Sequence, residues 1–215
     1  FDAFENNLDV HAVYTDFRKA FDTVNHFILL KKLYLYGLRD PLLSWLKTYL
    51  LDRYQCVHLN GVSSNEYLVT SGVPQGSVIG PLLFNIFIND IASNITSDTL
   101  LYADDLKLFK SIRTLTDTVV LQSDITKIEE WCNMSLNLDK CQVICFSRKF
   151  ASSPCSYILC GTALSVVKEI KDLGVLLDAK LSFHCHYDTI ISKGRKMLGC
   201  VKRWSTDFND IRVLV

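Results

Sequence analysis

Two adjacent aspartates, Asp104 and Asp105, stand between two apolar runs in the stretch "TLLYADDLKLF" from Thr99 to Phe109. In a continuous strand, neighbouring side chains point to opposite faces, so one carboxylate would enter the core unpaired at a high cost in free energy. A tight turn at 103–105 removes this conflict, because Asp tolerates unusual backbone dihedral angles and both side chains then reach one edge of a sheet. The stretch therefore predicts a β-hairpin with two carboxylates at its tip.

Two carboxylates this close repel each other, which raises the pKa of at least one of them, and a divalent cation relieves the repulsion. Oxygen ligands favour Mg²⁺ or Mn²⁺ over zinc. Asp16, near the end of an expected strand over 9–17, is the best candidate for a further carboxylate. Two metal ions about 3.5–4 Å apart clamp the attacking and leaving oxygens of a phosphoryl transfer. An ordinary solvent-exposed turn is the alternative interpretation of the Asp pair.

The rest of the sequence predicts the elements that must position these carboxylates. Apolar residues at helical spacing predict helices over 20–38, 40–51, 81–93, 114–134 and about 183–204. Residues typical of strands predict further strands over 142–147 and at the end of 170–178, with hairpins over 54–69 and 157–167. The glycine-rich segment 71–81 predicts a loop. Strands and helices mixed with antiparallel hairpins indicate an α+β fold.

Composition sets further bounds. The 215 residues are 49% hydrophobic, enough for a sizeable core, and no apolar run reaches the roughly 18 residues of a membrane span. Residues 1–139 hold 11 Lys and Arg against 17 Asp and Glu, whereas residues 140–215 hold 12 against 6. An acidic half that binds metal, followed by a basic half that contacts phosphate, would produce this asymmetry. A chance distribution of solvated charges explains it equally well.

Cysteine and histidine residues raise the question of a second metal site. Eight scattered cysteines are expected to be reduced and mostly buried, as in an intracellular protein. In a strand, Cys141 and Cys145 would lie about 13 Å apart at about 3.3 Å per residue, too far for two thiolates on one zinc. Asp22 and His26, four residues apart, are expected to form a pair on a helix surface.

Three stretches together resemble reverse transcriptases, specifically those of non-LTR retrotransposons of the jockey/CR1 kind. They are "YTDFRKAFDTVNHFILLKKLYLYGL" (14–38), "SGVPQGSVIGPLLFNIFINDI" (71–91) and "YADD" (102–105), with weaker matches over 136–147 and 171–190. The resemblance implies a right-hand polymerase: a palm over 1–180 with an antiparallel sheet and packed helices, then the start of a helical thumb over 181–215. It implies RNA-directed DNA synthesis from dNTPs, extending a DNA primer on an RNA template with two Mg²⁺ ions or Mn²⁺.

The resemblance also implies a role for individual residues. The metal carboxylates would be Asp16, Asp104 and Asp105, and Lys140 would protonate the leaving pyrophosphate, although an exposed Lys after a turn is ordinary. The nucleotide side of the site would comprise Phe17, Phe21, Gln75, Gly76 and Tyr102. Among these, Phe21 would be a gate against the 2′-OH, with plain core packing as its alternative. Primer and template would meet Leu173 and Gly174 of a primer grip and the basic helix that carries Lys193 and Lys196.

Three classes of function follow from these residues. The first is an active polymerase, the second a truncated, inactive copy that only binds RNA–DNA hybrid, and the third an interaction domain that kept the fold. Intact Asp16, Asp104 and Asp105 favour the first class. The chain begins at Phe1 without an initiator Met, and the fingers that resembling proteins carry before Asp16 are largely missing. We therefore expect a fragment that is weak or inactive alone, whose partner is the rest of a retrotransposon polyprotein with its fingers and endonuclease, in the nucleus.

Overall fold

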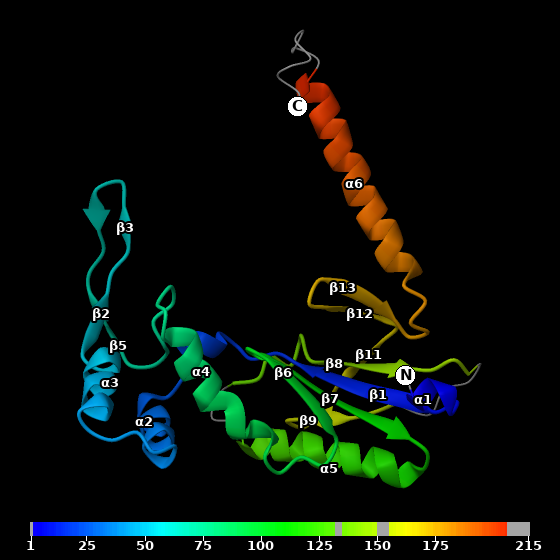
Figure 1. Ribbon diagram of the computed structural model, residues 1–215, viewed down its shortest axis with the longest axis horizontal. Helices are drawn as coiled ribbons and strands as arrows, with labels where there is room; N and C mark the ends of the chain where they lie inside the picture. The colour runs from blue at the N-terminus through cyan, green and yellow to red at the C-terminus, as the bar shows by residue number, and fades with distance from the viewer. Residues whose placement is uncertain (1, 132–134, 150–154, 206–215) are drawn as a thin grey trace.

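The computed structural model describes residues 2–131, 135–149 and 155–205. Its centre is a five-stranded sheet with the strand order β11-β8-β1-β7-β6 (Figure 1). These strands are β1 (Asp9–Thr15), β6 (Asp98–Tyr102), β7 (Asp105–Ile112), β8 (Gln142–Phe146) and β11 (Ser165–Val167). β11 runs parallel to β8, and the other neighbours are antiparallel. β1 lies in the middle of the sheet, so the chain builds the site around its first strand.

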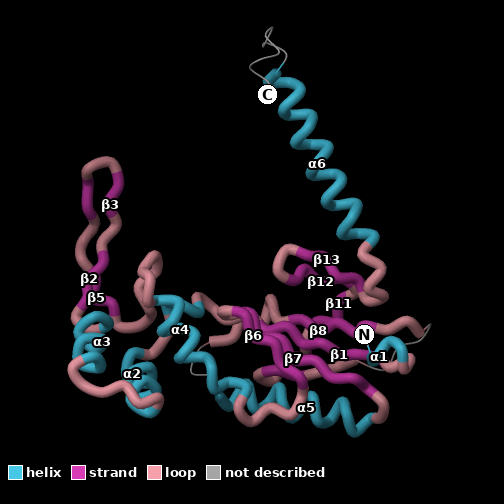
Figure 2. Tube along the Cα trace, viewed as in Figure 1, coloured by secondary structure: helices cyan, strands magenta, loops and turns pink. Residues whose placement is uncertain are grey.

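Helices and small two-stranded sheets lie against this sheet and beyond its ends (Figure 2). The helices are α1 (Asp2–Glu5), α2 (His26–Leu35), α3 (Leu42–Leu50), α4 (Gly80–Ile88), α5 (Leu115–Trp131) and α6 (His184–Ser205), with 3-10 turns η1 (Ala20–Asp22) and η2 (Asn89–Ala92). The small sheets pair β2 (Arg53–Gln55) with β5 (Tyr67–Val69), β3 (His58–Leu59) with β4 (Val62–Ser63), β9 (Ile158–Leu159) with β10 (Thr162–Ala163) and β12 (Glu169–Asp172) with β13 (Val175–Asp178). This mixture confirms the α+β class.

The two faces of the central sheet are covered differently. On one face α5 supplies Leu121, Ile125 and Ile128 to the main core, where Val13 of β1 and Leu108 of β7 are also buried. On the other face a smaller cluster of Ala12, Ile144, Phe146 and Ile170 joins the sheet to the β12–β13 hairpin. Because a slip of one residue would exchange the two faces of β1, burial on both faces fixes its register.

The helix predicted over 20–38 is two elements in the structure. The 3-10 turn η1 comes first, and α2 begins only at His26. Asn25 separates them, because its Oδ1 accepts hydrogen bonds from the backbone N–H groups of Phe27 (3.0 Å) and Ile28 (3.1 Å). A side chain that caps free N–H groups in this way sets the first turn of a helix, and the apolar spacing alone did not reveal it.

His26 corrects a second expectation, because it is 2% exposed and does not form a surface pair with Asp22. Its Nε2 donates a hydrogen bond of 2.7 Å to the carbonyl oxygen of Gly72. Asp22 instead accepts a 2.7 Å hydrogen bond from Nε2 of Gln75. Asp22 therefore joins the η1 turn, and His26 the start of α2, to the glycine-rich loop.

Two further expectations need correction. The hairpin predicted over 157–167 ends at β10, and β11 leaves it to pair with β8 of the central sheet. Local strand propensity does not show which distant strand a segment will pair with. The thiols are not mostly buried: among the described cysteines, two are buried and two half-buried, while three are exposed, namely Cys56, Cys160 and Cys200.

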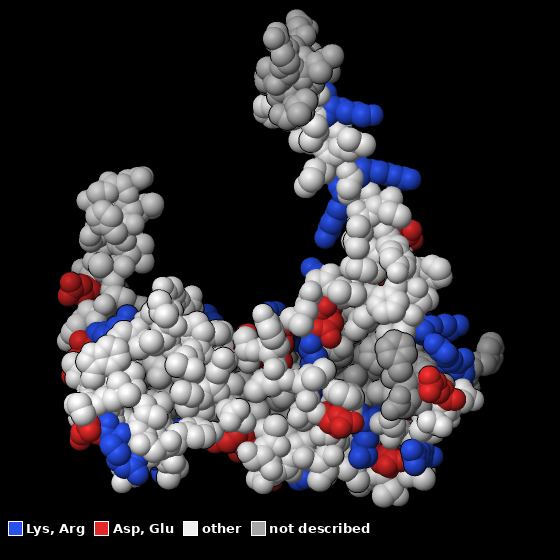
Figure 3. All heavy atoms as spheres, viewed as in Figure 1, with Lys and Arg blue, Asp and Glu red and all other residues white. Residues whose placement is uncertain are grey.

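The helix α6 extends away from the rest of the molecule (Figure 1). None of its residues is buried, and Lys and Arg side chains project from it (Figure 3). The Asp178 carboxylate accepts hydrogen bonds from the N–H groups of Ser182 (3.1 Å) and Phe183 (2.7 Å) before the helix begins. Among the described helices, none has the length and apolar character needed to cross a membrane.

Candidate active site

The Asp104–Asp105 pair lies at the tip of the predicted hairpin. Tyr102 of β6 is paired with Asp105 of β7, which leaves Ala103 and Asp104 as the connecting turn. Ala103 has a φ of 52°, a left-handed conformation that is uncommon for a residue with a Cβ atom. The turn explains how two adjacent aspartates fit between two apolar runs, because both carboxylates leave the sheet at its edge and neither enters the core.

The third carboxylate reaches the same edge from the neighbouring strand. Thr15, the last residue of β1, is paired with Leu106, so Asp16 follows β1 directly beside the start of β7. Asp16 and Asp105 both border a cavity of about 240 Å³. Asp16 and Asp104 both border a second cavity of about 750 Å³. The ends of three strands thus bring the three predicted carboxylates to one region of the surface.

Two polar side chains from a later loop hold the carboxylate of Asp16. Asn137 Nδ2 donates a hydrogen bond of 3.0 Å to Asp16 Oδ2, and Lys140 Nζ lies 3.5 Å from the same oxygen. The backbone supports this arrangement, since Asn137 N–H donates to the Asp16 carbonyl at 2.8 Å and Leu136 bridges to Phe17. Lys140 therefore lies at the site as predicted, whereas Asn137 was missed, because an isolated Asn in a turn carries no signal in the sequence.

The electrostatics of the site are those of clustered negative charge. Burial and the Asp104 carboxylate raise the pKa of Asp105, and Asp16 adds to this shift while the Lys107 ammonium opposes it. No Cys or His is among the described residues that border the two cavities. A set of carboxylate oxygens without thiolates or imidazoles fits a hard divalent cation such as Mg²⁺.

The carboxylates are close but do not form a finished ligand set. In the part of the chain that the structure describes, no three His, Cys, Asp or Glu side chains converge closely enough to hold a metal ion. The Asp16 side chain is directed to Asn137 and Lys140, and mutual repulsion disfavours closer approach of like charges. The described cysteines and histidines likewise form no group that could bind zinc, so they provide no second metal site.

The aromatic residues that follow Asp16 differ in their surroundings. Phe17 borders the cavity of about 750 Å³ but is only 3% exposed and belongs to the core. Phe21 is half-buried and stacks on Phe84, with ring centroids 4.2 Å apart, while it also borders the cavity of about 750 Å³. Packing and contact with the cavity are therefore compatible for Phe21, whereas the ring of Phe17 has little surface left for a substrate.

The glycine-rich loop approaches the η1 turn closely. Gly72 has a φ of +90°, and a Cβ atom there would lie 2.7 Å from the Asp22 carbonyl oxygen, so only glycine fits. Gln75 and Gly76, the two residues predicted on the nucleotide side, are exposed. Gln75 borders the cavity that contains Asp16 and also a neighbouring one of about 540 Å³. The loop therefore places Gln75 between two hollows of the surface.

The remaining predicted residues lie around this centre. Tyr102 is 66% exposed at the end of β6. Leu173 and Gly174 form the turn between β12 and β13, both with positive φ values, and Leu173 is exposed. Lys193 and Lys196 are exposed on α6, apart from the carboxylates. The structure thus groups Tyr102 with the carboxylate hairpin and leaves the two lysines on a separate arm.

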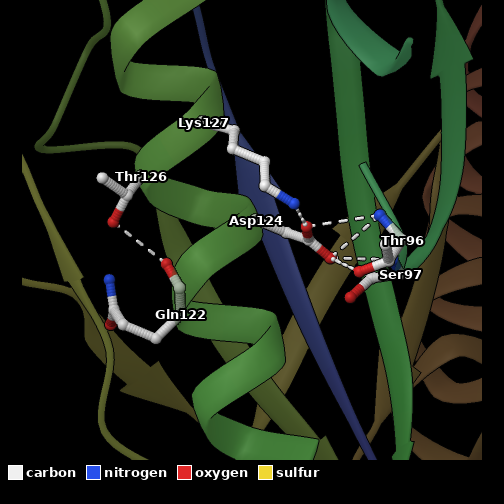
Figure 4. A network of polar contacts seen from close by, with 6 residues as sticks. All are labelled: Thr96, Ser97, Gln122, Asp124, Thr126 and Lys127. Atoms are coloured by element: carbon white, nitrogen blue, oxygen red, sulfur yellow. Dashed lines mark hydrogen bonds and ion pairs between the residues drawn. The ribbon is translucent and has the colours of Figure 1, made fainter. Parts of the chain in front are cut away.

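A buried carboxylate on α5 fixes the entry to the β6–β7 hairpin (Figure 4). Asp124 is fully buried and accepts hydrogen bonds from the N–H groups of Thr96 (3.2 Å) and Ser97 (2.7 Å), and from Lys127 Nζ (2.7 Å). Burial alone would raise the pKa of Asp124, but these hydrogen bonds lower it below the ordinary value. The network anchors the segment that leads into β6, whose far end carries the Asp pair.

Comparison with known proteins identifies the family to which the chain is similar. Residues 2–199 match the family model described as reverse transcriptase (RNA-dependent DNA polymerase). The chain is 31% identical to the RNA-directed DNA polymerase from mobile element jockey of Drosophila funebris, over 99% of the chain and 25% of that protein. The chain thus spans about a quarter of the length of the curated relatives it matches.

Two solved structures share the fold at low sequence identity. Apo telomerase from Candida tropicalis, truncated from the C-terminal domain, has a TM-score of 0.59 at 13% identity, over 85% of this chain and 36% of that one. Telomerase from the same organism, in complex with a TWJ fragment of telomeric RNA, has a TM-score of 0.57 at 12% identity, over 85% and 30%. These likenesses confirm a polymerase palm-like fold. With the match over residues 2–199, the chain belongs to the reverse transcriptase (RNA-dependent DNA polymerase) family.

Proposed function

We propose that this chain is the polymerase core of a non-LTR retrotransposon reverse transcriptase, which extends a DNA primer on an RNA template. The observation that carries the proposal is that adjoining strand ends carry Asp16, Asp104 and Asp105 to one edge of the sheet, within a chain that matches the family over most of its length. If the Asp pair were only a solvent-exposed turn, there would be no reason for a third carboxylate beside it. Asp16 nevertheless reaches this edge from a strand almost ninety residues earlier in the sequence.

In this proposal the three carboxylates hold two Mg²⁺ ions, which would neutralise charge on the attacking and leaving oxygens. The protein's own groups prepare that state. Asn137 orients one oxygen of Asp16 by its hydrogen bond, as outer residues do for metal ligands generally. Lys140, held 3.5 Å from Asp16, is the acid that protonates the departing pyrophosphate.

The nucleic acid and the nucleotide occupy different parts of the surface in this proposal. The incoming dNTP enters the cavity bordered by Phe21, Gln75 and Asp104. The RNA–DNA duplex lies against the basic face of α6, where phosphates would release counterions on binding. A telomerase of the same fold is described in complex with an RNA fragment, which supports a nucleic-acid template for this chain.

The experiment measures metal binding and primer extension separately. Manganese binding to the 215-residue chain is followed by electron paramagnetic resonance. Single-turnover extension of oligo(dT) on poly(rA) is measured, with protein in excess, on this chain fused to the fingers of a retrotransposon relative, because the chain alone is expected to be weak or inactive. Asp16→Asn, Asp104→Asn and Asp105→Asn each remove a charge at nearly constant volume. We expect each to lower extension by more than about 100-fold, beyond the loss typical of outer-shell residues, and to weaken manganese binding.

Asp117→Asn serves as the matched control, because this carboxylate caps the start of α5 away from the cavities. It should leave manganese binding and extension unchanged. A wild-type fusion that binds hybrid but neither binds manganese nor extends primers would contradict the polymerase and identify an inactive hybrid-binding copy. Equal losses for Asp117→Asn and the three site variants would show that the effect is general.

A further inference from the structure

The β12–β13 hairpin rests on the central sheet as a separate two-stranded unit and leads directly into α6 (Figures 1 and 2). At its base, Ser147 N–H donates to the Ala179 carbonyl (2.9 Å), and Ala179 N–H donates to the Lys168 carbonyl (2.9 Å). Ile170 is buried against the sheet. These contacts secure the open end of the hairpin but not its turn at 173–174.

Near the turn, the hairpin is joined to the central sheet through the carboxylate of Asp172. Asp172, the last residue of β12, forms an ion pair with Lys107 Nζ and accepts a hydrogen bond of 3.2 Å from the Tyr14 hydroxyl. The side chains of Lys107 and Asp172 are only 10% and 19% exposed. Lys107 Nζ also lies 5.6 Å from the centre of the Tyr14 ring. We call these three residues the latch.

The latch is built on the same strands and the same sheet face as the metal carboxylates. Tyr14 of β1 is paired directly with Lys107 of β7. Residues two apart in a strand share a face, so Tyr14 lies on the face of Asp16, and Lys107 lies on the face of Asp105. The cavity of about 240 Å³ is bordered by all four of these residues and by Ile170 and Lys171 of the hairpin.

From this geometry we propose that Asp172 is a positioning residue: through Lys107 and Tyr14 it fixes the turn at 173–174 relative to Asp16 and Asp105, and so sets where the primer 3′ end lies. This inference rests on the proposed polymerase function. Displacements of about 1 Å between reacting groups are costly for catalysis. A hairpin joined to the sheet only at its base would permit such displacements, whereas an ion pair to the carboxylate strands prevents them.

The variants separate the ion pair from its two charges. Asp172→Asn keeps an acceptor for Tyr14 but leaves the Lys107 ammonium without its partner in a buried place. Lys107→Met leaves the Asp172 carboxylate without its partner. The double variant carries neither charge, and removing both partners costs less than leaving one unpaired. Lys110→Met is the control. Lys110 lies on the same strand, three residues after Lys107, and is therefore on the opposite face of the sheet.

Two measurements are made on the wild type and these variants, each as the 215-residue chain fused to the same fingers. Hydrogen exchange reports the protection of β12–β13 amides, and primer extension gives KM for primer–template and kcat. We expect Asp172→Asn and Lys107→Met to raise this KM about 10-fold, below the roughly 100-fold loss that a misplacement of about 1 Å can cause, with a smaller change in kcat and faster exchange near the turn. The double variant should recover part of both effects, and Lys110→Met should match the wild type.

Unchanged KM in folded single variants with faster hairpin exchange would overturn the positioning role and leave only a structural ion pair. Unchanged exchange would overturn the latch itself. A wild-type fusion that fails to extend primers would instead remove the proposed polymerase function, and the positioning role with it. Hydrogen exchange would still report in that case whether Asp172 holds the hairpin, so the two failures are distinguishable.

Discussion

Asp16 shows how one side chain depends on groups far away in the sequence. Its Oδ2 is shared between Asn137 and Lys140, more than 120 residues later. A cation bound beside Asp16 would compete with the Lys140 ammonium for the same carboxylate, because both are positive. Lys140 is 67% exposed, so it can leave Asp16 at little cost, whereas the neutral amide of Asn137 can remain and keep the carboxylate oriented.

Phe21→Val tests whether this ring selects the sugar. The ring borders the cavity of Asp16 and Asp104 and is fixed by stacking on Phe84. A rigid ring rejects an added hydroxyl by steric clash, so the smaller side chain should raise incorporation of ribonucleotides while largely preserving use of dNTPs. The lost packing should also lower the free energy of unfolding by about 1–3 kcal/mol. Competition between rNTPs and dNTPs in primer extension measures the selectivity.

Phe27→Val is the matched control for this prediction. Phe27 is 74% exposed on α2, so its replacement should change neither stability nor sugar selectivity. An unchanged preference between rNTPs and dNTPs in folded Phe21→Val would count against the gate and leave the packing role alone. A change of preference in Phe27→Val would show that the assay responds to substitutions away from the cavity.

At this scale the sequence identified the residues within short motifs but not their distant supports. Asp16, Asp104, Asp105 and Lys140 follow from local patterns, and the structure places them together. The bond between Lys107 and Asp172 joins residues 65 positions apart. Such a pair depends on how the hairpin folds back on the sheet, and single-sequence patterns contain no information on that approach.

Among the elements, α5 and the β6–β7 hairpin are coupled by the buried Asp124. Asp124→Asn should lower the free energy of unfolding by about 3 kcal/mol, because it weakens several charge-assisted hydrogen bonds in a buried place. Urea unfolding followed by circular dichroism measures the effect. Glu130→Gln changes an exposed carboxylate on the same helix and should have almost no effect.

The pH dependence of stability gives a separate prediction for Asp124. Its folded pKa is lowered, so the unfolded chain takes up the proton first, near its ordinary pKa of about 3.9. The stabilising contribution is therefore complete above that pH and is lost as the pH falls toward the lower folded pKa. The difference in unfolding free energy between wild type and Asp124→Asn should narrow between pH 7 and pH 3. A constant difference over this range would contradict the prediction.

Most elements were predictable because their signals are local. The strand at 142–147, the hairpin over 54–69 and the long final helix follow from alternation, turn residues and helical spacing, and the structure contains all three. The failures arose where a competing contact decided the result. The side chain of Asn25 caps the N-terminus of α2 and so separates it from η1. The strand β11 pairs with β8 of the central sheet and not with the neighbouring hairpin strands.

At the scale of the whole molecule, the acidic site and the basic arm are spatially separate. The carboxylates lie at the edge of the central sheet, while α6 extends away from the body with its Lys and Arg side chains in solvent (Figures 1 and 3). Five of the twelve Lys and Arg residues of 140–215 lie on α6, so part of the charge asymmetry between the two halves of the sequence is also a separation in space. A duplex bound along α6 could reach the site through the β12–β13 hairpin, which joins the two regions.

The basic arm predicts the salt dependence of hybrid binding. Lys193 and Lys196 are three residues apart, so they project from neighbouring positions on one side of α6. If both neutralise phosphates, Lys193→Gln/Lys196→Gln should weaken binding of an RNA–DNA hybrid and make the slope of log K against log salt less steep by about 1 for each lysine removed. Fluorescence anisotropy of a labelled hybrid at several salt concentrations measures both quantities.

The control must remove the same charge elsewhere. Lys31→Gln/Lys47→Gln does so on α2 and α3, where both lysines are exposed, at the opposite side of the molecule from α6 (Figure 1). Long-range attraction alone would give both double variants the same small loss, since it depends on net charge and is screened beyond about 10 Å at 0.1 M salt. Direct phosphate contact requires that only the α6 variant changes the slope, and equal slopes in the two variants would exclude α6 as the duplex-binding arm.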